Sequence, residues 1–168
     1  YLSRLEARMV EINRQPCNFA DIFESLCATG WSKHRNDETR YIVESPYEQL
    51  TIDIDAENLG QAIVQVAANA AQHTKSGVVK ARYDYIGRRL IISIDDTGDG
   101  IPAAQLAQIR QERRGSAHTT KGLGLAITKE LVGQMGGMME IMSEEGSGTT
   151  VYIAIPCHAS VMKRKTRS

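Results

Sequence analysis

The segment LIISIDDTGDGIP, at residues 90–102, joins a β-branched run to an abrupt end in glycine and proline. β-Branched residues favour strands and glycine and proline end them, so residues 90–96 are predicted to form a strand. Side chains alternate along a strand, which places Asp96 in the same row as Ile92 and Ile94. A carboxylate that ends an apolar row is costly unless a partner donates hydrogen bonds to it. The segment therefore indicates a cavity in which a ligand with N–H groups meets Asp96.

Two glycines follow this carboxylate. Besides a ligand site, the segment has three alternative interpretations, which are a turn, a calcium loop and a protease motif. Gly98 and Gly100 have no Cβ, so they allow a tight turn and close approach by a flat ligand. A solvated turn after a hairpin strand is the simplest alternative. A calcium-binding loop starting at Asp95 needs a bidentate glutamate at its last position, which is Leu106 here. An aspartic protease is a remote alternative, because Asp-Thr-Gly occurs once and the residues after it do not suit that fold.

Composition narrows the class of protein. A chain of 168 residues is long enough for one domain with a core. The 20 basic residues balance the 20 acidic ones, so no charge-driven binding of nucleic acid is expected. Cys17, Cys27 and Cys157 form an odd, scattered set, typical of a reducing compartment and not of a structural metal site. No apolar run approaches a membrane span, and no signal peptide is recognisable.

Periodicity predicts the remaining elements. Residues 2–12 carry apolar residues at helical spacing and are predicted to be the end of a longer helix that stops before Pro16. Because the chain starts at Tyr1 without methionine, it is expected to be a fragment. Asn18 is predicted to cap a second helix that ends near Gly30. The other predicted elements are a loop at residues 31–39, strands at 41–44 and 50–54, a helix at 56–74, a hairpin of 77–86 with 88–96, helices at 103–111 and from 122, and a hairpin of 138–142 with 149–155.

The predicted helix at residues 56–74 carries a second, polar stripe beside its apolar one. Gln65, Asn69, Gln72 and His73 share this stripe at spacings of three and four residues. The stripe is consistent with a solvated edge, but the alanines around Asn69 would also let a ligand come close. The side-chain oxygen of Asn69 is a suitable ligand for magnesium, which takes few protein ligands beside phosphate and water.

The residues around position 122 indicate an anion site. Backbone N–H groups at a helix N-terminus bind phosphate, so the start of the helix at 122–125 can hold one. A single Gly-x-Gly is weak evidence, and the chain has neither a Walker Gly-Lys-Ser/Thr nor the strand-glycine-helix start of a dinucleotide fold. The preceding residues 112–121 contain no apolar residue larger than alanine, and we expect them to be mobile.

These motifs occur in the order of a known family. QVAANAAQHT at residues 65–74, DTGDGI at 96–101 and GLGLAI at 122–127 resemble the N, G1 and G2 boxes of the ATP-binding catalytic domain of sensor histidine kinases. GSGTT at 146–150 is similar to the glycine and threonine segment before that domain's last strand. The wider group includes gyrase, the Hsp90 chaperones and MutL.

The resemblance implies an architecture. We expect an α/β (α+β) two-layer sandwich of the Bergerat ATP-binding type, with a mixed, largely antiparallel sheet and three main helices on one face. Residues 1–14 would be the end of the dimerisation and phosphotransfer helix with its linker, and residues 15–157 the catalytic domain. Residues 158–168 would form a basic tail. Its basic run at residues 163–167 is expected to be a frayed, solvated end rather than a binding patch.

The resemblance also implies a reaction with ATP and Mg²⁺ as cofactors. Asp96 would accept the exocyclic amino hydrogen of adenine, and Asn69 with Gln65 would hold magnesium against the phosphates. Residues 112–121 would close as a lid. No catalytic residue is certain, and the lid candidates are Arg113, Arg114 and Lys121. The nucleotide-binding residues implied are Gln65, Asn69, His73, Asp96, Gly98, Gly100, Ile101, Gly122, Leu123, Gly124, Leu125 and Thr149.

The γ-phosphoryl would go to a histidine on a phosphotransfer domain that this fragment lacks, and then to a response regulator. No histidine is followed directly by the acidic residue of the family's phosphoacceptor motif, so the acceptor is expected upstream of Tyr1. We expect a monomeric fragment and a homodimeric parent. The domain would be cytoplasmic, and the resemblance allows the parent to be an inner-membrane sensor without direct membrane contact by this domain.

The sequence departs from the family's pattern at the polar stripe. Gln65 stands where the family has asparagine, and Gln72 where it often has lysine, so the phosphates have one fewer cationic partner. The alternatives are therefore a degenerate nucleotide-binding or interaction module without transfer activity, or a related ATPase or serine kinase.

Overall fold

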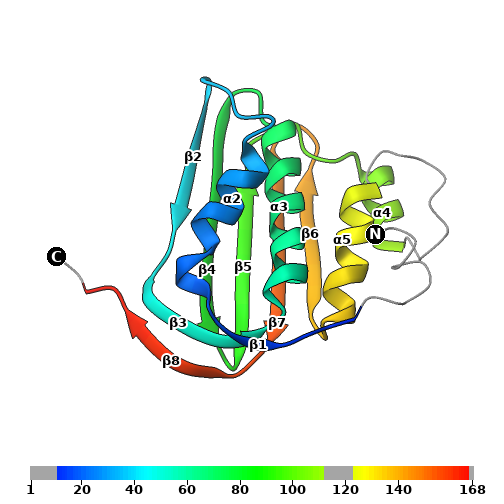
Figure 1. Cartoon of the computed structure of the whole chain (residues 1–168). Coiled ribbons are helices and arrows are strands. Elements are labelled where there is room, and N and C mark those ends of the chain that lie inside the picture. The colour runs from blue at the N-terminus through cyan, green and yellow to red at the C-terminus, as the bar shows by residue number, and fades with distance from the viewer. Residues whose placement is uncertain (1–10, 112–122, 167–168) are drawn as a thin grey trace.

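The computed structural model describes residues 11–111 and 123–166, and within them the main sheet has five strands in the order β2-β4-β5-β7-β6. Strand β2 runs parallel to β4, and the other neighbours are antiparallel. Three helices lie across one face of this sheet, with α4 beyond α5 (Figure 1). The predicted two-layer α/β sandwich is confirmed. The elements are β2 (Thr39–Glu44), β4 (Gly77–Ile86), β5 (Arg89–Asp96), β7 (Gly148–Pro156), β6 (Met138–Glu144), α2 (Phe23–Trp31), α3 (Ala56–Gln72), α4 (Ala103–Gln111) and α5 (Leu123–Gln134).

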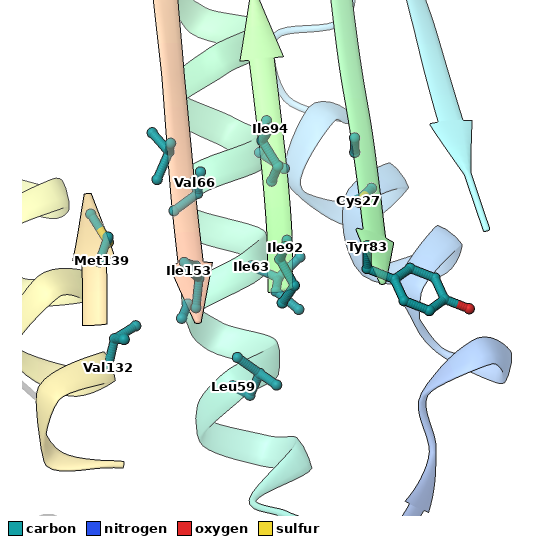
Figure 2. Packing of buried hydrophobic residues seen from close by; sticks show 14 of the residues in the cluster. Cys27, Leu59, Ile63, Val66, Tyr83, Ile92, Ile94, Val132, Met139 and Ile153 are labelled. Carbon is teal, nitrogen blue, oxygen red and sulfur yellow. The ribbon is translucent and has the colours of Figure 1, made fainter. Parts of the chain in front are cut away.

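One core fills the space between the two layers. Ile92 and Ile94 on β5 are buried and point toward α3, where Ile63 and Val66 meet them (Figure 2). Val132 of α5, the helix beside α3, belongs to the same cluster. Each fully buried side chain of this size contributes roughly 1.5–3 kcal/mol to folding, so the layers are held mainly by apolar burial.

A second, smaller sheet was not predicted. It consists of β1 (Gln15–Asn18), β3 (Tyr47–Ile54) and β8 (Ala159–Arg164), with β3 paired antiparallel to both neighbours. The frayed end expected at residues 163–167 is therefore wrong for residues 163 and 164, which belong to β8. Most side chains of β8 are exposed, so no apolar alternation marks it as a strand, and its backbone pairs because β3 offers an edge.

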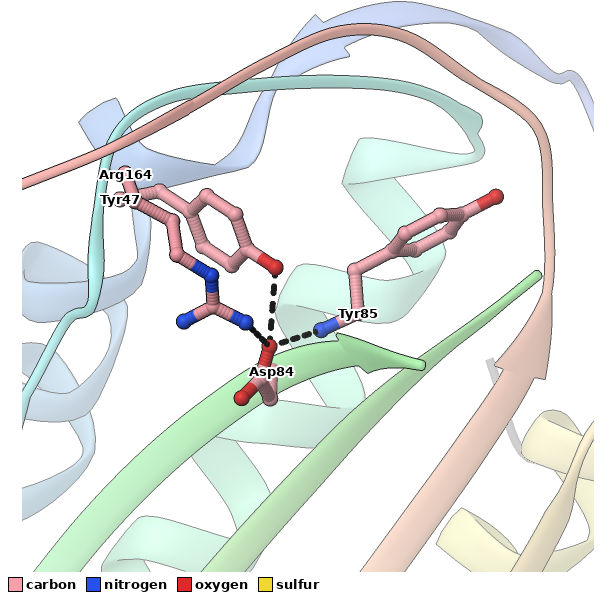
Figure 3. Close-up of polar contacts among 4 residues, drawn as sticks. All are labelled: Tyr47, Asp84, Tyr85 and Arg164. Atoms are coloured by element: carbon pink, nitrogen blue, oxygen red, sulfur yellow. Dashed lines mark hydrogen bonds and ion pairs between the residues drawn. The ribbon is translucent and has the colours of Figure 1, made fainter. Parts of the chain in front are cut away.

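Side-chain contacts attach β8 to the main sheet as well. The Asp84 Oδ1 on β4 accepts hydrogen bonds from the Tyr47 hydroxyl at 2.9 Å and from Arg164 Nη2 at 3.0 Å (Figure 3). The backbone N–H of Tyr85 donates to the same oxygen at 2.7 Å. The Arg164 guanidinium also lies 4.7 Å from the centroid of the Tyr47 ring. A single carboxylate thus joins β3, β4 and β8.

The N-terminal predictions are met in part. Most of the helix predicted at residues 2–12 lies outside the described residues, and positions 11 and 12 are not helical. Asn18 is a cap as predicted, but it caps a short 3₁₀ turn (Phe19–Asp21) before α2, through a 3.3 Å bond from Ala20 N to its side chain. Trp31 was predicted to lie in a loop but ends α2 with only 2% exposure, because its ring packs 5.2 Å from that of Tyr41.

We expect Gly30→Ala to destabilise the fold. A Cβ at Gly30 would lie 2.5 Å from the Val64 carbonyl oxygen and 2.6 Å from the Ala67 Cβ, where α2 crosses α3. Overpacking at this crossing should lower the protein's free energy of unfolding by about 1–3 kcal/mol, which urea denaturation measures. Gly133→Ala in α5 is the control, because its Cβ would meet no atom of the described residues within 4 Å. It should stabilise the protein by roughly 0.5 kcal/mol through helix propensity. Equal effects of the two substitutions would contradict the close crossing.

Candidate functional site

Asp96 ends β5 in a nearly enclosed position. It is 7% exposed and continues the buried row of β5, as the alternation predicted. Its Oδ1 accepts a hydrogen bond from the Gly98 N–H at 2.9 Å. Burial raises the pKa of this carboxyl above its usual value, although the Gly98 amide and the nearby His73 oppose the shift. A buried acceptor of this kind is suited to a ligand that donates N–H groups.

The loop after Asp96 is fitted closely between α3 and the β6–β7 turn. The backbone N–H of Asp99 donates to the His73 carbonyl at 3.1 Å, and the Gly146 N–H donates to the Asp99 carbonyl at 2.6 Å. A Cβ at Gly98 would lie 2.1 Å from the same His73 carbonyl oxygen. Gly100 has φ +72°, and a Cβ at this position would lie 2.1 Å from the Glu144 carbonyl oxygen. Larger residues at either glycine would displace the loop from α3.

The C-terminal half of α3 supplies the polar stripe of the site. Asn69 and His73 are half-buried, and Gln65 and Gln72 are exposed. His73 follows the last residue of α3 and lies near enough to Asp96 to affect the pKa of its carboxyl. His73 and Asp96 therefore come together at one end of the sheet, and Asn69 lies one helical turn before His73 in α3.

The start of α5 approaches the same stripe. A Cβ at Gly124 would lie only 2.6 Å from Gln65 Nε2, so the Gln65 side chain rests against the first turn of α5. Leu125 is buried in the core and fixes this turn. The first N–H groups of an α-helix have no partner within the helix and carry its positive dipole end. The arrangement places the N-terminal end of α5, an end that favours anions in general, beside the amide stripe of α3.

Thr149 lies beside Asp96, and Ser143 is a residue that sequence reasoning missed. Thr149 is buried and is the direct partner of Asp96 between β7 and β5. Its hydroxyl lies 2.8 Å from the Ser143 Oγ, which accepts the Ile101 N–H at 2.7 Å and donates to the Gly148 carbonyl at 3.0 Å. Ser143 thus ties the loop after Asp96 to the β6–β7 hairpin. Only the hairpin register pairs it with Thr149, and the predicted strand stopped at residue 142.

Some predicted site residues are not placed. Gly122, Arg113, Arg114 and Lys121 lie outside the described residues, and Leu123 is placed only as the first residue of α5. Among residues 11–111 and 123–166, no group of three or more His, Cys, Asp or Glu side chains could hold a metal ion. In the same part of the chain, no helix combines the length and apolar character that a membrane span needs.

Comparison with known proteins identifies the family. A sequence profile of the histidine kinase-, DNA gyrase B- and HSP90-like ATPases matches residues 54–159. The chain belongs to this family. The match includes α3, Asp96 with its loop, and α5, the elements that build the site described above.

Individual relatives include sensor kinases. The aerobic respiration control sensor protein ArcB of Escherichia coli (strain K12) is 28% identical over 167 residues, covering 92% of this chain and 21% of ArcB. The sensor protein kinase WalK of Staphylococcus haemolyticus (strain JCSC1435) is 33% identical over 129 residues, covering 71% of this chain and 21% of WalK. Full-length ShkA in complex with AMPPNP has a TM-score of 0.80 at 24% identity, covering 95% of this chain and 34% of ShkA, which shows the shared fold. The chain thus spans about a fifth of the length of ArcB and WalK.

We expect Asp96→Asn to stabilise the ligand-free protein at neutral pH. The pKa of Asp96 is raised in the folded state, so ionisation of this group costs stability at every pH above its folded pKa. That cost shrinks as pH falls from the folded pKa toward the lower pKa of the unfolded chain, and the advantage of the variant should shrink with it. An asparagine oxygen can still accept the Gly98 N–H. Urea denaturation between about pH 4 and pH 8 measures the difference.

Asp95→Asn is the matched control for this prediction. Asp95 is the preceding residue on the opposite face of β5, and its Oδ1 accepts a 2.6 Å bond from Thr150 Oγ1. Removing this charge weakens a charge-assisted hydrogen bond, so the control should lose stability at pH 7. A parallel loss in Asp96→Asn would contradict the assignment of Asp96 as an ionised group that destabilises the fold.

Proposed function

We propose that this chain is the ATP-binding catalytic domain of a protein-histidine kinase in a two-component system. The observation that carries the proposal is the buried Asp96 carboxylate beside the C-terminal end of α3, in a chain of this ATPase family. Adenine carries an exocyclic amino group where guanine has a carbonyl oxygen. A buried, charged acceptor would be left without a donor by guanine, so it selects adenine.

The residues around Asp96 suit the rest of an adenine nucleotide. The Asp96 carboxylate accepts one N–H from Gly98 and keeps lone pairs for a ligand. Gly98 and Gly100 have no side chains, so a flat base can lie close to the backbone of the loop. Ile101 and Thr149 would border the base, because Ser143 holds both of them beside Asp96.

The phosphates would lie between α3 and the start of α5. The Asn69 side-chain oxygen is a hard ligand that suits magnesium, and an ion of this kind takes most of its other ligands from phosphate and water. Gln65 is longer than asparagine and rests on Gly124, so its amide can join the ion or hydrogen-bond a phosphate oxygen. When bound, magnesium neutralises phosphate charge. Free N–H groups of the first turn of α5 would bind the phosphate oxygens.

The proposed reaction breaks the bond between the γ-phosphorus and the β,γ-bridging oxygen, and ADP leaves. A bond then joins the γ-phosphorus to a ring nitrogen of the acceptor histidine. Positioning and charge neutralisation supply most of the catalysis in phosphoryl transfer. The acceptor domain, a response regulator and a homodimeric parent are proposed parts of a larger cytoplasmic assembly, in which residues 1–14 lead from the phosphotransfer helix and Arg113, Arg114 and Lys121 belong to the lid.

Calorimetry with ATP and magnesium tests the binding site. The protein should bind ATP, and Asp96→Asn should weaken binding by roughly 10- to 100-fold, the range for losing a hydrogen bond to a charged group. Asn69→Ala should bind weakly and without dependence on magnesium. Asp95→Asn should bind like the parent protein, because its side chain is on the opposite face of β5. Absence of binding by the parent protein at millimolar ATP would reject the proposed function.

Transfer is tested with ATP labelled at the γ-phosphoryl group and a separate histidine phosphotransfer domain. We expect acid-labile label on the histidine of that domain, and none with Asp96→Asn at low ATP. Label on serine, or free phosphate without acceptor, would instead indicate a related kinase or ATPase. ATP binding without any transfer would indicate a nucleotide-binding module in which Gln65 and Gln72 no longer support the reaction.

A further inference from the structure

Arg14 lies just before β1, and its side chain hydrogen-bonds backbone carbonyl groups that are distant in the sequence. Its Nη1 donates to the Pro156 carbonyl at 2.8 Å and to the Asp53 carbonyl at 3.5 Å, and its Nη2 donates to the Met135 carbonyl at 2.8 Å. Pro156 ends β7, Asp53 lies in β3, and Met135 directly follows α5. One guanidinium therefore holds the backbone of three elements that are distant in the sequence.

The contact with Met135 fits the chemistry of a helix end. The last carbonyl groups of an α-helix have no N–H partner within the helix and carry the negative end of its dipole. Gly136, at φ +79°, turns the chain there, and the Gly137 N–H closes the helix on the Val132 carbonyl at 3.0 Å. A cation that donates hydrogen bonds at this end stabilises the helix and fixes its position.

The same short stretch of chain also holds the N-terminus of α3. The backbone N–H of Asn13 donates to Asp55 Oδ2 at 2.8 Å, and Asp55 is the N-cap of α3. Asn58 Nδ2 donates to the Glu11 carbonyl at 3.4 Å. Burial would raise the pKa of Asp55, but the amides of Asn58 and Asn13 hold it below its usual value. Residues 11–14 therefore fix two helix ends at once.

Both helices lead from these ends to the candidate site. Helix α5 has 12 residues, which makes it about 18 Å long. Its first turn, with Gly124 against Gln65, is the part proposed to bind phosphate. A hydrogen-bonded helix moves as a rigid unit, so a shift at Met135 displaces its first turn.

We propose that Arg14 is a positioning residue that holds α5 through its C-terminal end and so sets where residues 123–125 lie at the nucleotide site. The nucleotide part of this inference rests on the proposed function, whereas the hold on α5 does not. A movement of the chain before Arg14 would then change nucleotide affinity without touching the site.

Hydrogen exchange without nucleotide tests the hold on α5. In Arg14→Ala, the amides of residues 127–134 should exchange about tenfold faster, while those of β4 and β5 keep their rates. Arg14→Lys keeps the charge but loses the planar fork, and should resemble the alanine variant. Arg164→Ala is the matched control. Arg164 is also an exposed arginine, but the strand that it holds, β8, is distant from α5. Unchanged α5 exchange in Arg14→Ala, or equal acceleration throughout the domain, would overturn the proposal.

Calorimetry of the same variants tests the effect on the site. Arg14→Ala should weaken ATP–magnesium binding by roughly 2- to 30-fold, the usual range of coupling through packed elements, and Arg164→Ala should not. Faster α5 exchange with unchanged affinity would reject the link between Arg14 and the site and leave the proposed function intact. If the parent protein bound no ATP, the proposed function would fail, and with it the nucleotide part of this inference.

Discussion

The packing of the buried row of β5 against α3 is the constraint on which the rest of the structure depends. Ile92 and Ile94 meet Ile63 and Val66, and this contact sets the height and direction of α3 over the sheet (Figure 2). The same row ends in Asp96, so the apolar packing that forms the core also positions a carboxylate at the edge of the core. The candidate site is therefore a continuation of the core and not an addition to the surface.

Burying a carboxylate is unfavourable, and the structure around Asp96 compensates with backbone groups. The Gly98 N–H is one such partner, but burial still raises the pKa of this carboxyl above its usual value. A buried carboxylate of this kind gains from a ligand that donates hydrogen bonds. Stability and the proposed function are thus opposed at Asp96, as is common where a charged group is held for binding.

Helix ends connect the other parts of the molecule. The C-terminal end of α3 and the first turn of α5 face the site, whereas their opposite ends are held by residues 11–14 through Asp55 and Arg14. Helices transmit displacement along their axes because their backbone hydrogen bonds resist stretching. The segment that precedes the domain is consequently attached to the two elements that would contact a nucleotide, although it does not reach the site itself.

The sequence by itself determined the elements whose signal is local. Apolar periodicity defined α3, the glycine at position 87 marked the β4–β5 hairpin, and strand alternation put Asp96 in the buried row. The tertiary structure alone decided features that need a partner far along the chain. Strand β8 pairs because β3 leaves an edge open, Ser143 acts because the hairpin register sets it beside Thr149, and Arg14 finds Met135 across the fold. An isolated polar or basic side chain such as Ser143 or Arg14 belongs to no periodic pattern, so its role becomes visible only when folding brings its partner within hydrogen-bonding distance.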